Sequence, residues 1–169
     1  KIRLKNGYII AEAPNGLRGA DIFLGGPFGS TVLGTANVLM AATLAKGRTV
    51  IESAACEPEI ADLANCLNKM GAKISGIGSP RLIIQGVSGL KAVEYTVIPE
   101  RIEAGTFMVA AAITASELHV QNCRLDDMMA VVHKLRGIGV SVEPAGDGCT
   151  VALSGPLKTA DITTQPHPG

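Results

Sequence analysis

Hydrophobic positions along the chain follow a helical period in some segments and form short strand-like runs in others, which predicts a mixed α/β fold. The clearest helical segment is residues 57–71, "EPEIADLANCLNKMG". Its apolar positions recur every three or four residues: Ile60, Leu63, Ala64, Leu67 and Met70. This spacing places them on one face of an amphipathic helix. Pro58 suits the first turn of that helix and Gly71 suits the position just after its end.

A matching helix is predicted over residues 125–139, "LDDMMAVVHKLRGIG". Its apolar face consists of Met128, Val131, Val132 and Leu135. Two further helical segments, "GTANVLMAATLAKG" at 34–47 and "AGTFMVAAAITASE" at 104–117, are apolar nearly all round. A helix with no polar face is usually buried, so we expect both segments to lie in the interior.

Three similar segments show that the chain contains a repeat. They are "LRGADIFLGGP" from Leu17, "LKAVEYTVIP" from Leu90 and "LKTADITTQP" from Leu157. Each has Leu, then a basic residue, then a strand-like run that ends at Pro, and each follows another apolar strand ("YIIAEA", "RLIIQGV" and "TVALSG"). We call them marker segments.

Similar elements recur in the same order between the marker segments. An apolar helix leads to a strand ("RTVIES" or "ELHVQN"), an amphipathic helix and another strand ("AKISGI" or "VSVEPA"). A period of about 70 residues is longer than the common solenoid repeats. The pattern therefore predicts an α/β (α+β) fold in which repeated units pack around a shared core.

Composition narrows the class of protein. The 169 residues are 47% hydrophobic, carry a formal net charge of zero and contain no Trp. A neutral balance argues against nucleic acid or an anionic membrane as the main partner. No apolar run reaches the roughly 18 residues of a membrane span, and no signal peptide opens the chain. The chain starts without Met and ends at "QPHPG", so it reads as a segment of a longer protein.

Cysteines and histidines give no sign of a metal site or cofactor. Cys56, Cys66, Cys123 and Cys149 have no C-x-x-C spacing, and the sequence alone cannot pair them. Because no secretory signal is seen, we expect reduced cysteines in a cytosolic protein. We interpret the last three as packing residues. None of the three histidines has metal-ligand spacing with another His or a Cys pair.

The first candidate site is a Gly-, Ser- and Thr-rich turn, "GPFGSTVLGTAN", which leads into a helix expected to begin near Thr35. Backbone amides at a helix N-terminus attract phosphate, and the segment that presents them is Gly29, Ser30, Thr31 and Val32. The turn is no P-loop, because the Gly-Lys-Ser/Thr ending is missing. Spacing alone favours a simple cap and tight turn over a phosphate site.

The second candidate is "PERIEAGTF", where Glu100 and Arg101 follow a strand-like run and open a helix. An arginine in that place suits an anionic substrate group. A local ion pair among Glu100, Arg101 and Glu103 explains the pattern equally well.

The third candidate is "SAACEPEI", in which Cys56 and Glu57 precede the amphipathic helix. Helix N-termini favour thiolate, which lowers the pKa of a cysteine there. A reactive cysteine also needs a nearby cation or His, and the surrounding residues supply none. An acid in a first turn is expected for dipole reasons alone. Local evidence therefore favours a structural role for both residues.

Three strings carry a family resemblance. They are "MAATLAKGRTVIESAACEPEIADLANCLNKMGAKISGIGSPRLIIQGV", "VIPERIEAGTFMVAAA" and the terminal "TQPHPG". Together they resemble the UDP-N-acetylglucosamine 1-carboxyvinyltransferase family of bacterial enolpyruvyl transferases. The resemblance covers essentially the whole chain, which is less than half of a full-length member.

This resemblance implies a fold and a domain organisation. The family has two similar domains, each made of three βαβαββ units and often called an inside-out α/β barrel. Residues 1–99 then correspond to the later part of the catalytic domain, and residues 100–169 to the start of the second domain.

The implied reaction is the first committed step of peptidoglycan synthesis in the bacterial cytoplasm. The 3′-hydroxyl of UDP-N-acetylglucosamine attacks C2 of phosphoenolpyruvate while C3 is protonated, and the tetrahedral intermediate then loses phosphate. Such a site needs cations, a general acid and a base. The resemblance implies these two substrates as partners and no cofactor, metal, nucleic acid or membrane.

Site residues carry over by position. Gly29, Ser30, Thr31 and Val32 match the family segment that wraps the uridine diphosphate, although the family commonly has Ser-Val-Gly where this chain has Thr31, Val32 and Leu33. Glu57, Glu100 and Arg101 match residues near the substrate cleft.

Parts of the family site have no counterpart here. The loop that bears the catalytic cysteine has none, the Cys56 position is commonly arginine in the family, and the catalytic aspartate follows the "PHP" motif at a point beyond Gly169. We therefore expect no catalytic residue within these residues and no activity from them alone. Two alternatives stay open: a transferase like 5-enolpyruvylshikimate-3-phosphate synthase, and a non-catalytic nucleotide-sugar-binding module of the same fold.

Overall fold

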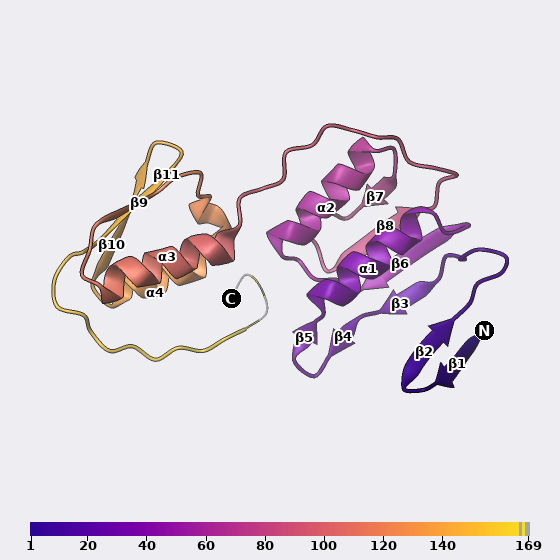
Figure 1. The fold of residues 1–169 in the computed structure, drawn as a ribbon, viewed down its shortest axis with the longest axis horizontal. Coiled ribbons are helices and arrows are strands. Elements are labelled where there is room, and N and C mark those ends of the chain that lie inside the picture. Colours follow the sequence, from indigo (N-terminus) through magenta and orange to yellow (C-terminus); the bar gives the residue numbers. More distant parts are fainter. Residues whose placement is uncertain (166, 168–169) are drawn as a thin grey trace. The chain divides into compact units, whose positions relative to one another are not determined.

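The computed structural model describes residues 1–165 and 167. It divides into two compact units, Lys1–Tyr95 and Thr96–Gly169, here called unit 1 and unit 2 (Figure 1). Each has its own helices, sheet and core. The assignment of residues 1–99 and 100–169 to two different domains of a larger protein stays a prediction.

Unit 1 begins with an antiparallel hairpin of β1 (Ile2–Lys5) and β2 (Tyr8–Ala11). Its main sheet has the order β3-β6-β8-β7, and β3 runs parallel to β6 while the other neighbours are antiparallel. The strands are β3 (Asp21–Phe23), β6 (Arg48–Glu52), β7 (Lys73–Ser75) and β8 (Arg81–Gln85). A small hairpin of β4 (Gly25–Gly26) and β5 (Gly29–Ser30) leads into α1 (Val32–Thr43), and α2 (Pro58–Lys69) follows β6.

Unit 2 repeats the order of elements from α1 to β8, and its sheet has three strands where the main sheet of unit 1 has four. Helix α3 (Arg101–Ile113) is followed by β9 (Leu118–Val120), the 3-10 turn η1 (Leu125–Met128), α4 (Met129–Gly137), β10 (Val140–Ala145) and β11 (Gly148–Leu153). The sheet order is β10-β11-β9, all antiparallel. The predicted α+β fold of repeated units is therefore confirmed, while the closed barrel stays a prediction.

Each unit has a separate hydrophobic core between its helices and its sheet. In unit 1, Leu39 of α1 packs with Ile60 and Ala64 of α2 and with Ile51 and Ile84 of the sheet. The corresponding cluster in unit 2 contains Met108, Val132, Leu135, Val142 and Val151. The amphipathic face predicted for α2 is thus buried or half-buried, and Pro58 and Gly71 stand at its two ends as predicted.

The expectation that the two apolar helices are buried all round is wrong for this structure. On α1, Leu33 is 77% exposed and Met40 is 44% exposed, and on α3, Phe107 and Ile113 are exposed as well. One face of each helix packs on the sheet of its own unit. The opposite face is exposed, although it is also apolar. Val131 of α4 is likewise 40% exposed, although its predicted neighbours on the helix face are buried.

Two marker segments are not strands. Residues 90–99 and the described part of the segment from Leu157 have no strand pairing, whereas the segment from Leu17 contains β3 and β4. An extended segment becomes a strand only by pairing with another strand. Residues 90–95 and 157–162 instead lie along the amphipathic helix of their own unit. Pro166, Pro168 and Gly169 of the terminal "TQPHPG" motif lie outside the described residues.

Candidate functional site

The β4–β5 hairpin delivers the chain to the start of α1. Gly29 has a φ of +102°, which suits glycine in this tight turn. Thr31 is the N-cap of α1, and its Oγ1 accepts a hydrogen bond from the Gly34 amide at 3.2 Å. The helix therefore begins at Val32 and not near Thr35 as expected. Because the first amides of a helix have no intrahelical acceptor, those of Val32 and Leu33 are available to a ligand.

Three segments of unit 1 meet at this helix start. The hydroxyl of Thr35, which is fully buried, donates to the Thr31 carbonyl at 2.7 Å and accepts from the Ala55 amide at 3.0 Å. Ala55 lies in the loop between β6 and α2. Ser53 of the same loop lies close to Gly25 of β4. A Cβ atom added to Gly25 would be 2.9 Å from the Ser53 Oγ. The hairpin, the α1 N-terminus and the β6–α2 loop thus form one continuous region.

Glu57 closes this loop as the N-cap residue of α2. Its side chain makes no capping hydrogen bond. Its Oε2 atom is buried and has no hydrogen-bond partner within the part of the chain that the structure describes. An unpaired buried oxygen is energetically unfavourable, which makes it a ready acceptor for a ligand donor.

Cys56 does not behave as an activated thiol. Burial in the loop, and secondarily the neighbouring charge of Glu57, raise the pKa of the Cys56 thiol above its ordinary value. Its Sγ donates a weak hydrogen bond to the Ala54 carbonyl at 3.7 Å. The alternative in which the α2 N-terminus lowers the pKa of this cysteine is therefore wrong, and the structural role favoured by the sequence agrees with the geometry.

Glu100 and Arg101 open α3 in unit 2. The Glu100 carboxylate caps the helix, since its Oε1 accepts a hydrogen bond from the Ile102 amide at 2.8 Å. Arg101 lines a shallow apolar cavity of about 380 Å³ together with Gly105 and Met128. A local structural role accounts for Glu100, and Arg101 faces a space that a ligand can enter.

The structure thus gathers some of the candidates and leaves others elsewhere. Gly29–Val32 belong to the region that also contains the loop of Glu57, while Glu100 and Arg101 belong to unit 2. Sequence reasoning missed Thr35, the buried hydroxyl that joins α1 to the Glu57 loop. The signal was weak, because Thr35 is one of three polar residues in a mostly apolar helix, with Asn37 and Thr43.

Thr35→Val is expected to lower the free energy of unfolding of unit 1 by about 1–3 kcal/mol, because the Ala55 amide loses its acceptor at nearly unchanged volume. Thr106→Val is the matched control, since the exposed Thr106 hydroxyl makes the same helical bond, to Ile102 O at 2.8 Å, and accepts no hydrogen bond from the residues that the structure describes. We expect a change of about 0.5 kcal/mol or less there. Urea unfolding followed by circular dichroism measures both, and equal effects would contradict a bridging role for Thr35.

Metal and membrane features are absent from the described residues. Within residues 1–165 and 167, no group of three or more His, Cys, Asp or Glu is placed to hold a metal ion. Over the same range, no helix has the length and apolar character needed to cross a membrane.

Comparison with known proteins gives a consistent family assignment. Residues 1–169 match the family model described as EPSP synthase (3-phosphoshikimate 1-carboxyvinyltransferase). The chain is 51% identical, over 169 residues, to UDP-N-acetylglucosamine 1-carboxyvinyltransferase 2 of Mesorhizobium japonicum. It is 53% identical, again over 169 residues, to UDP-N-acetylglucosamine 1-carboxyvinyltransferase of Gluconobacter oxydans. Each match covers 100% of this chain and 40% of the relative, so the chain spans about 40% of their length.

A solved structure shares the fold. The enolpyruvyl transferase NikO from Streptomyces tendae superposes with a TM-score of 0.76 at 20% sequence identity. The match covers 98% of this chain and 42% of the NikO chain. The arrangement of helices and sheets in the two units is therefore one that an enolpyruvyl transferase uses.

Proposed function

The chain belongs to the EPSP synthase family of carboxyvinyl transferases, and from this premise we propose that it is part of an enzyme that transfers the enolpyruvyl group of phosphoenolpyruvate to UDP-N-acetylglucosamine. The observation that carries this proposal is the 51–53% identity, over all 169 residues, to proteins named for that reaction. In this proposal the parent protein acts in peptidoglycan synthesis in the bacterial cytoplasm.

Unit 1 supplies the nucleotide end of the proposed site. The amides of Gly29 to Val32, which run from β5 through the N-cap into the first residue of α1, hold the diphosphate of the nucleotide sugar. Two features support this: the first turn of α1 contains no acidic residue, and its N-terminal dipole favours an anion. The family commonly has glycine at the position of Leu33. The leucine leaves the backbone donors unchanged, because its side chain points outward and is 77% exposed.

Glu57 supplies an acceptor near the same helix start. Its unpaired Oε2 atom takes a hydrogen bond from a hydroxyl or amide of the sugar. Within unit 2, we propose Arg101 as a cation close to a substrate anion, and Glu100 holds the start of its helix. None of these residues is proposed as the general acid or base.

The main alternative is transfer to shikimate 3-phosphate, the acceptor of the enzyme that gives the family model its description. The names and identities of the relatives favour the nucleotide sugar. A non-catalytic module that binds the nucleotide sugar is a further alternative, since the chain matches 40% of those relatives. We also propose that residues 1–99 and 100–169 belong to two successive domains of the parent protein.

Titration of the ¹⁵N-labelled chain with UDP-N-acetylglucosamine, UDP or shikimate 3-phosphate tests the proposal. We expect the two uridine nucleotides to shift the amide resonances of Gly29–Val32, and shikimate 3-phosphate to leave them in place. Shifts of these amides by shikimate 3-phosphate alone would favour the alternative, and no response to any nucleotide would overturn the binding proposal. A coupled phosphate-release assay on the full-length parent protein separates an enzyme from a binding module.

Glu57→Gln is expected to weaken the binding of UDP-N-acetylglucosamine about tenfold, because a charged acceptor is replaced by a neutral one. The affinity for UDP should change less than about twofold, since UDP lacks the N-acetylglucosamine that Glu57 is proposed to contact. Glu59→Gln removes the same charge from the same helix start and serves as the matched control. Calorimetry measures the affinity of the unchanged chain and of each variant for both ligands, and an equal loss for UDP and for the nucleotide sugar in Glu57→Gln would contradict the role proposed for Glu57.

A further inference from the structure

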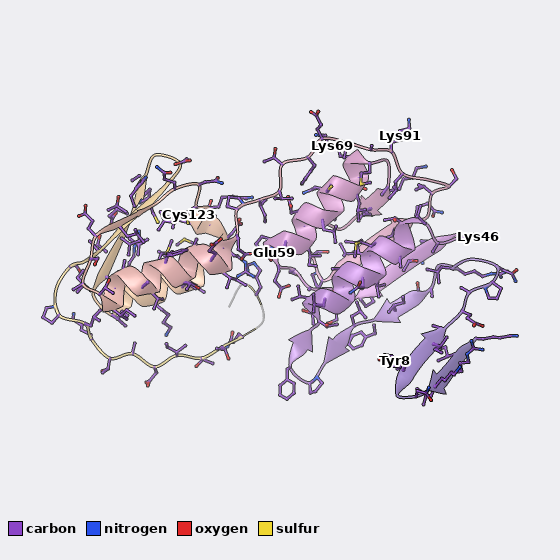
Figure 2. All side chains as sticks on the ribbon, viewed as in Figure 1. Tyr8, Lys46, Glu59, Lys69, Lys91 and Cys123 are labelled. Carbon is purple, nitrogen blue, oxygen red and sulfur yellow. The ribbon has the colours of Figure 1, made fainter. Side chains whose placement is uncertain are left out.

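The chain leaves unit 1 through a segment fastened along α2. Residues 90–95, here called the strap, form no strand, yet they are held at two points by hydrogen bonds to the helix end. The Lys91 amide donates to the Met70 carbonyl at 2.8 Å, and the Lys69 Nζ donates to the Glu94 carbonyl at 2.7 Å. Figure 2 labels Lys69 at the C-terminal end of α2 and Lys91 on the strap.

Tyr95 adds a third fastening at the last residue of unit 1. Its hydroxyl donates to the Asp62 Oδ1 at 2.7 Å and lies 3.2 Å from the Asp62 carbonyl oxygen. The Lys69 ammonium lies 5.8 Å from the centre of the Tyr95 ring, within the range of a cation–π contact. The division between the two units falls directly after this residue.

In unit 2, residues 157–162 form a second strap, which has counterparts of the first two hydrogen bonds but not of the tyrosine contact. The Lys158 amide donates to the Ile138 carbonyl at 2.9 Å, and the Lys134 Nζ donates to the Asp161 carbonyl at 2.9 Å. Aligned on its Leu-Lys start, this strap has Ile162 where the first has Tyr95, and Ile162 is 75% exposed. The first two fastenings are therefore common to both units, and the tyrosine anchor belongs to the strap that leads onward to α3.

We propose that Tyr95 is a positioning residue: by anchoring the strap to Asp62, it fixes the point from which the chain departs toward Glu100 and Arg101. Four residues, Thr96–Pro99, then separate the anchor from Glu100, and they span at most roughly 14 Å. With all three contacts of the strap released, as far back as Leu90, the tether has ten residues and spans roughly 35 Å. Full release lowers the effective concentration of one unit near the other about fourfold, and loss of the Tyr95 contact alone lowers it less. The consequence for substrates rests on the proposed function, but the anchor itself does not.

The protonation of Tyr95 gives the anchor a spectroscopic signature. The hydrogen bond to Asp62 is the largest cause that raises the pKa of Tyr95 to about 12, followed by burial and by the charges of Asp62 and Cys66. The groups that face it are Asp62, Cys66 and Lys69 of α2. A raised pKa means that the fold favours the protonated phenol. The stabilisation that the Tyr95 hydroxyl gives to the fold is therefore complete below about pH 10 and is lost as the pH rises through about 12.

Amide hydrogen exchange of the full 169-residue chain tests the anchor. In Tyr95→Phe, which keeps the ring over Lys69, the exchange rate of the Lys91 amide should rise about tenfold. Tyr8→Phe is the matched control, because Tyr8 is the other tyrosine of the chain and is 74% exposed. The Lys158 amide of the second strap is the internal reference. An unchanged Lys91 rate, or an equal rise for Lys158, would overturn the proposal.

Two further measurements separate positioning from general stability. ¹⁵N relaxation should give more independent tumbling of the two units in Tyr95→Phe than in Tyr8→Phe, and equal values would also overturn the proposal. In the Tyr8→Phe background, tyrosinate absorbance reports Tyr95 alone and should titrate near 12, and Asp62→Asn should lower that midpoint. If the Tyr8→Phe chain that keeps Asp62 titrates with a midpoint near 10, the Tyr95 hydroxyl is not anchored. No substrate is present in these measurements, so their outcome is independent of the proposed function.

Discussion

Replacing Leu39 by alanine is expected to destabilise unit 1 by about 2–5 kcal/mol, one of the two largest effects we predict for a single substitution. Leu39 is completely buried at the centre of the cluster in which α1, α2 and the main sheet meet. Truncation removes apolar contacts and leaves a cavity, because helices held on a four-stranded sheet collapse only partly around the lost side chain. Since a domain of this size has a small net stability, unit 1 should be largely unfolded at modest urea concentrations.

Leu33→Ala is the matched control for this prediction. Leu33 lies on the same helix and has the same chemistry, but its side chain is 77% exposed. We expect its effect to be about 0.5 kcal/mol or less. Urea titration followed by unit-specific amide resonances also shows whether the loss stays within unit 1, as two separate cores require. Equal effects of the two substitutions would mean that Leu39 does not occupy the centre of the core.

Gly148→Ala is expected to destabilise unit 2 by about 3 kcal/mol or more, because the new methyl group has no space. A Cβ atom on Gly148 would lie 1.9 Å from the Val120 carbonyl oxygen, which belongs to the backbone of the neighbouring strand β9. A backbone atom cannot rotate away as a side chain does, so β11 and β9 must separate where Cys149 pairs with Val120. The loss of β9 protection in hydrogen exchange and a lower unfolding midpoint measure this effect.

Gly137→Ala should change stability in the opposite direction. Gly137 is the last residue of α4, is exposed, and a Cβ atom there would contact nothing within 4 Å. Alanine reduces the conformational freedom of the unfolded chain, so we expect a gain of about 0.4–1 kcal/mol. Thermal unfolding of the two glycine variants side by side gives the sign directly. A loss of stability in both would show that the close contact at Gly148 is not the cause.

Elements with strong local signals were predicted well from the sequence. The helix Pro58–Lys69 has a proline at its start, a regular apolar face, and Gly71 with a φ of +104° just after its end, and each of these is a property of neighbouring residues. The alternation of helices and strands in both units follows from the same kind of signal. The α+β fold and the family resemblance are accordingly confirmed.

Features that depend on distant partners were not predicted. Residues 90–95 have a strand-like composition, but they lie on α2 because Met70 and Lys69 offer them hydrogen bonds. The exposed faces of α1 and α3 were missed because an apolar sequence does not specify which of its sides meets the sheet. At the candidate site, the helix start was predicted three residues late, near Thr35 instead of Val32. The contact of Thr35 with Ala55 was not predicted because it depends on residues twenty positions apart.

The two straps also bear on how such a chain can change over evolutionary time. Four of their fastenings use a main-chain carbonyl as the acceptor, and two of these use a main-chain amide as the donor. Substitution at Glu94 or Asp161 therefore leaves the acceptor in place, and these two side chains are free to diverge. A duplicated unit would carry these main-chain acceptors with it, whereas the contact between Tyr95 and Asp62 depends on two particular side chains.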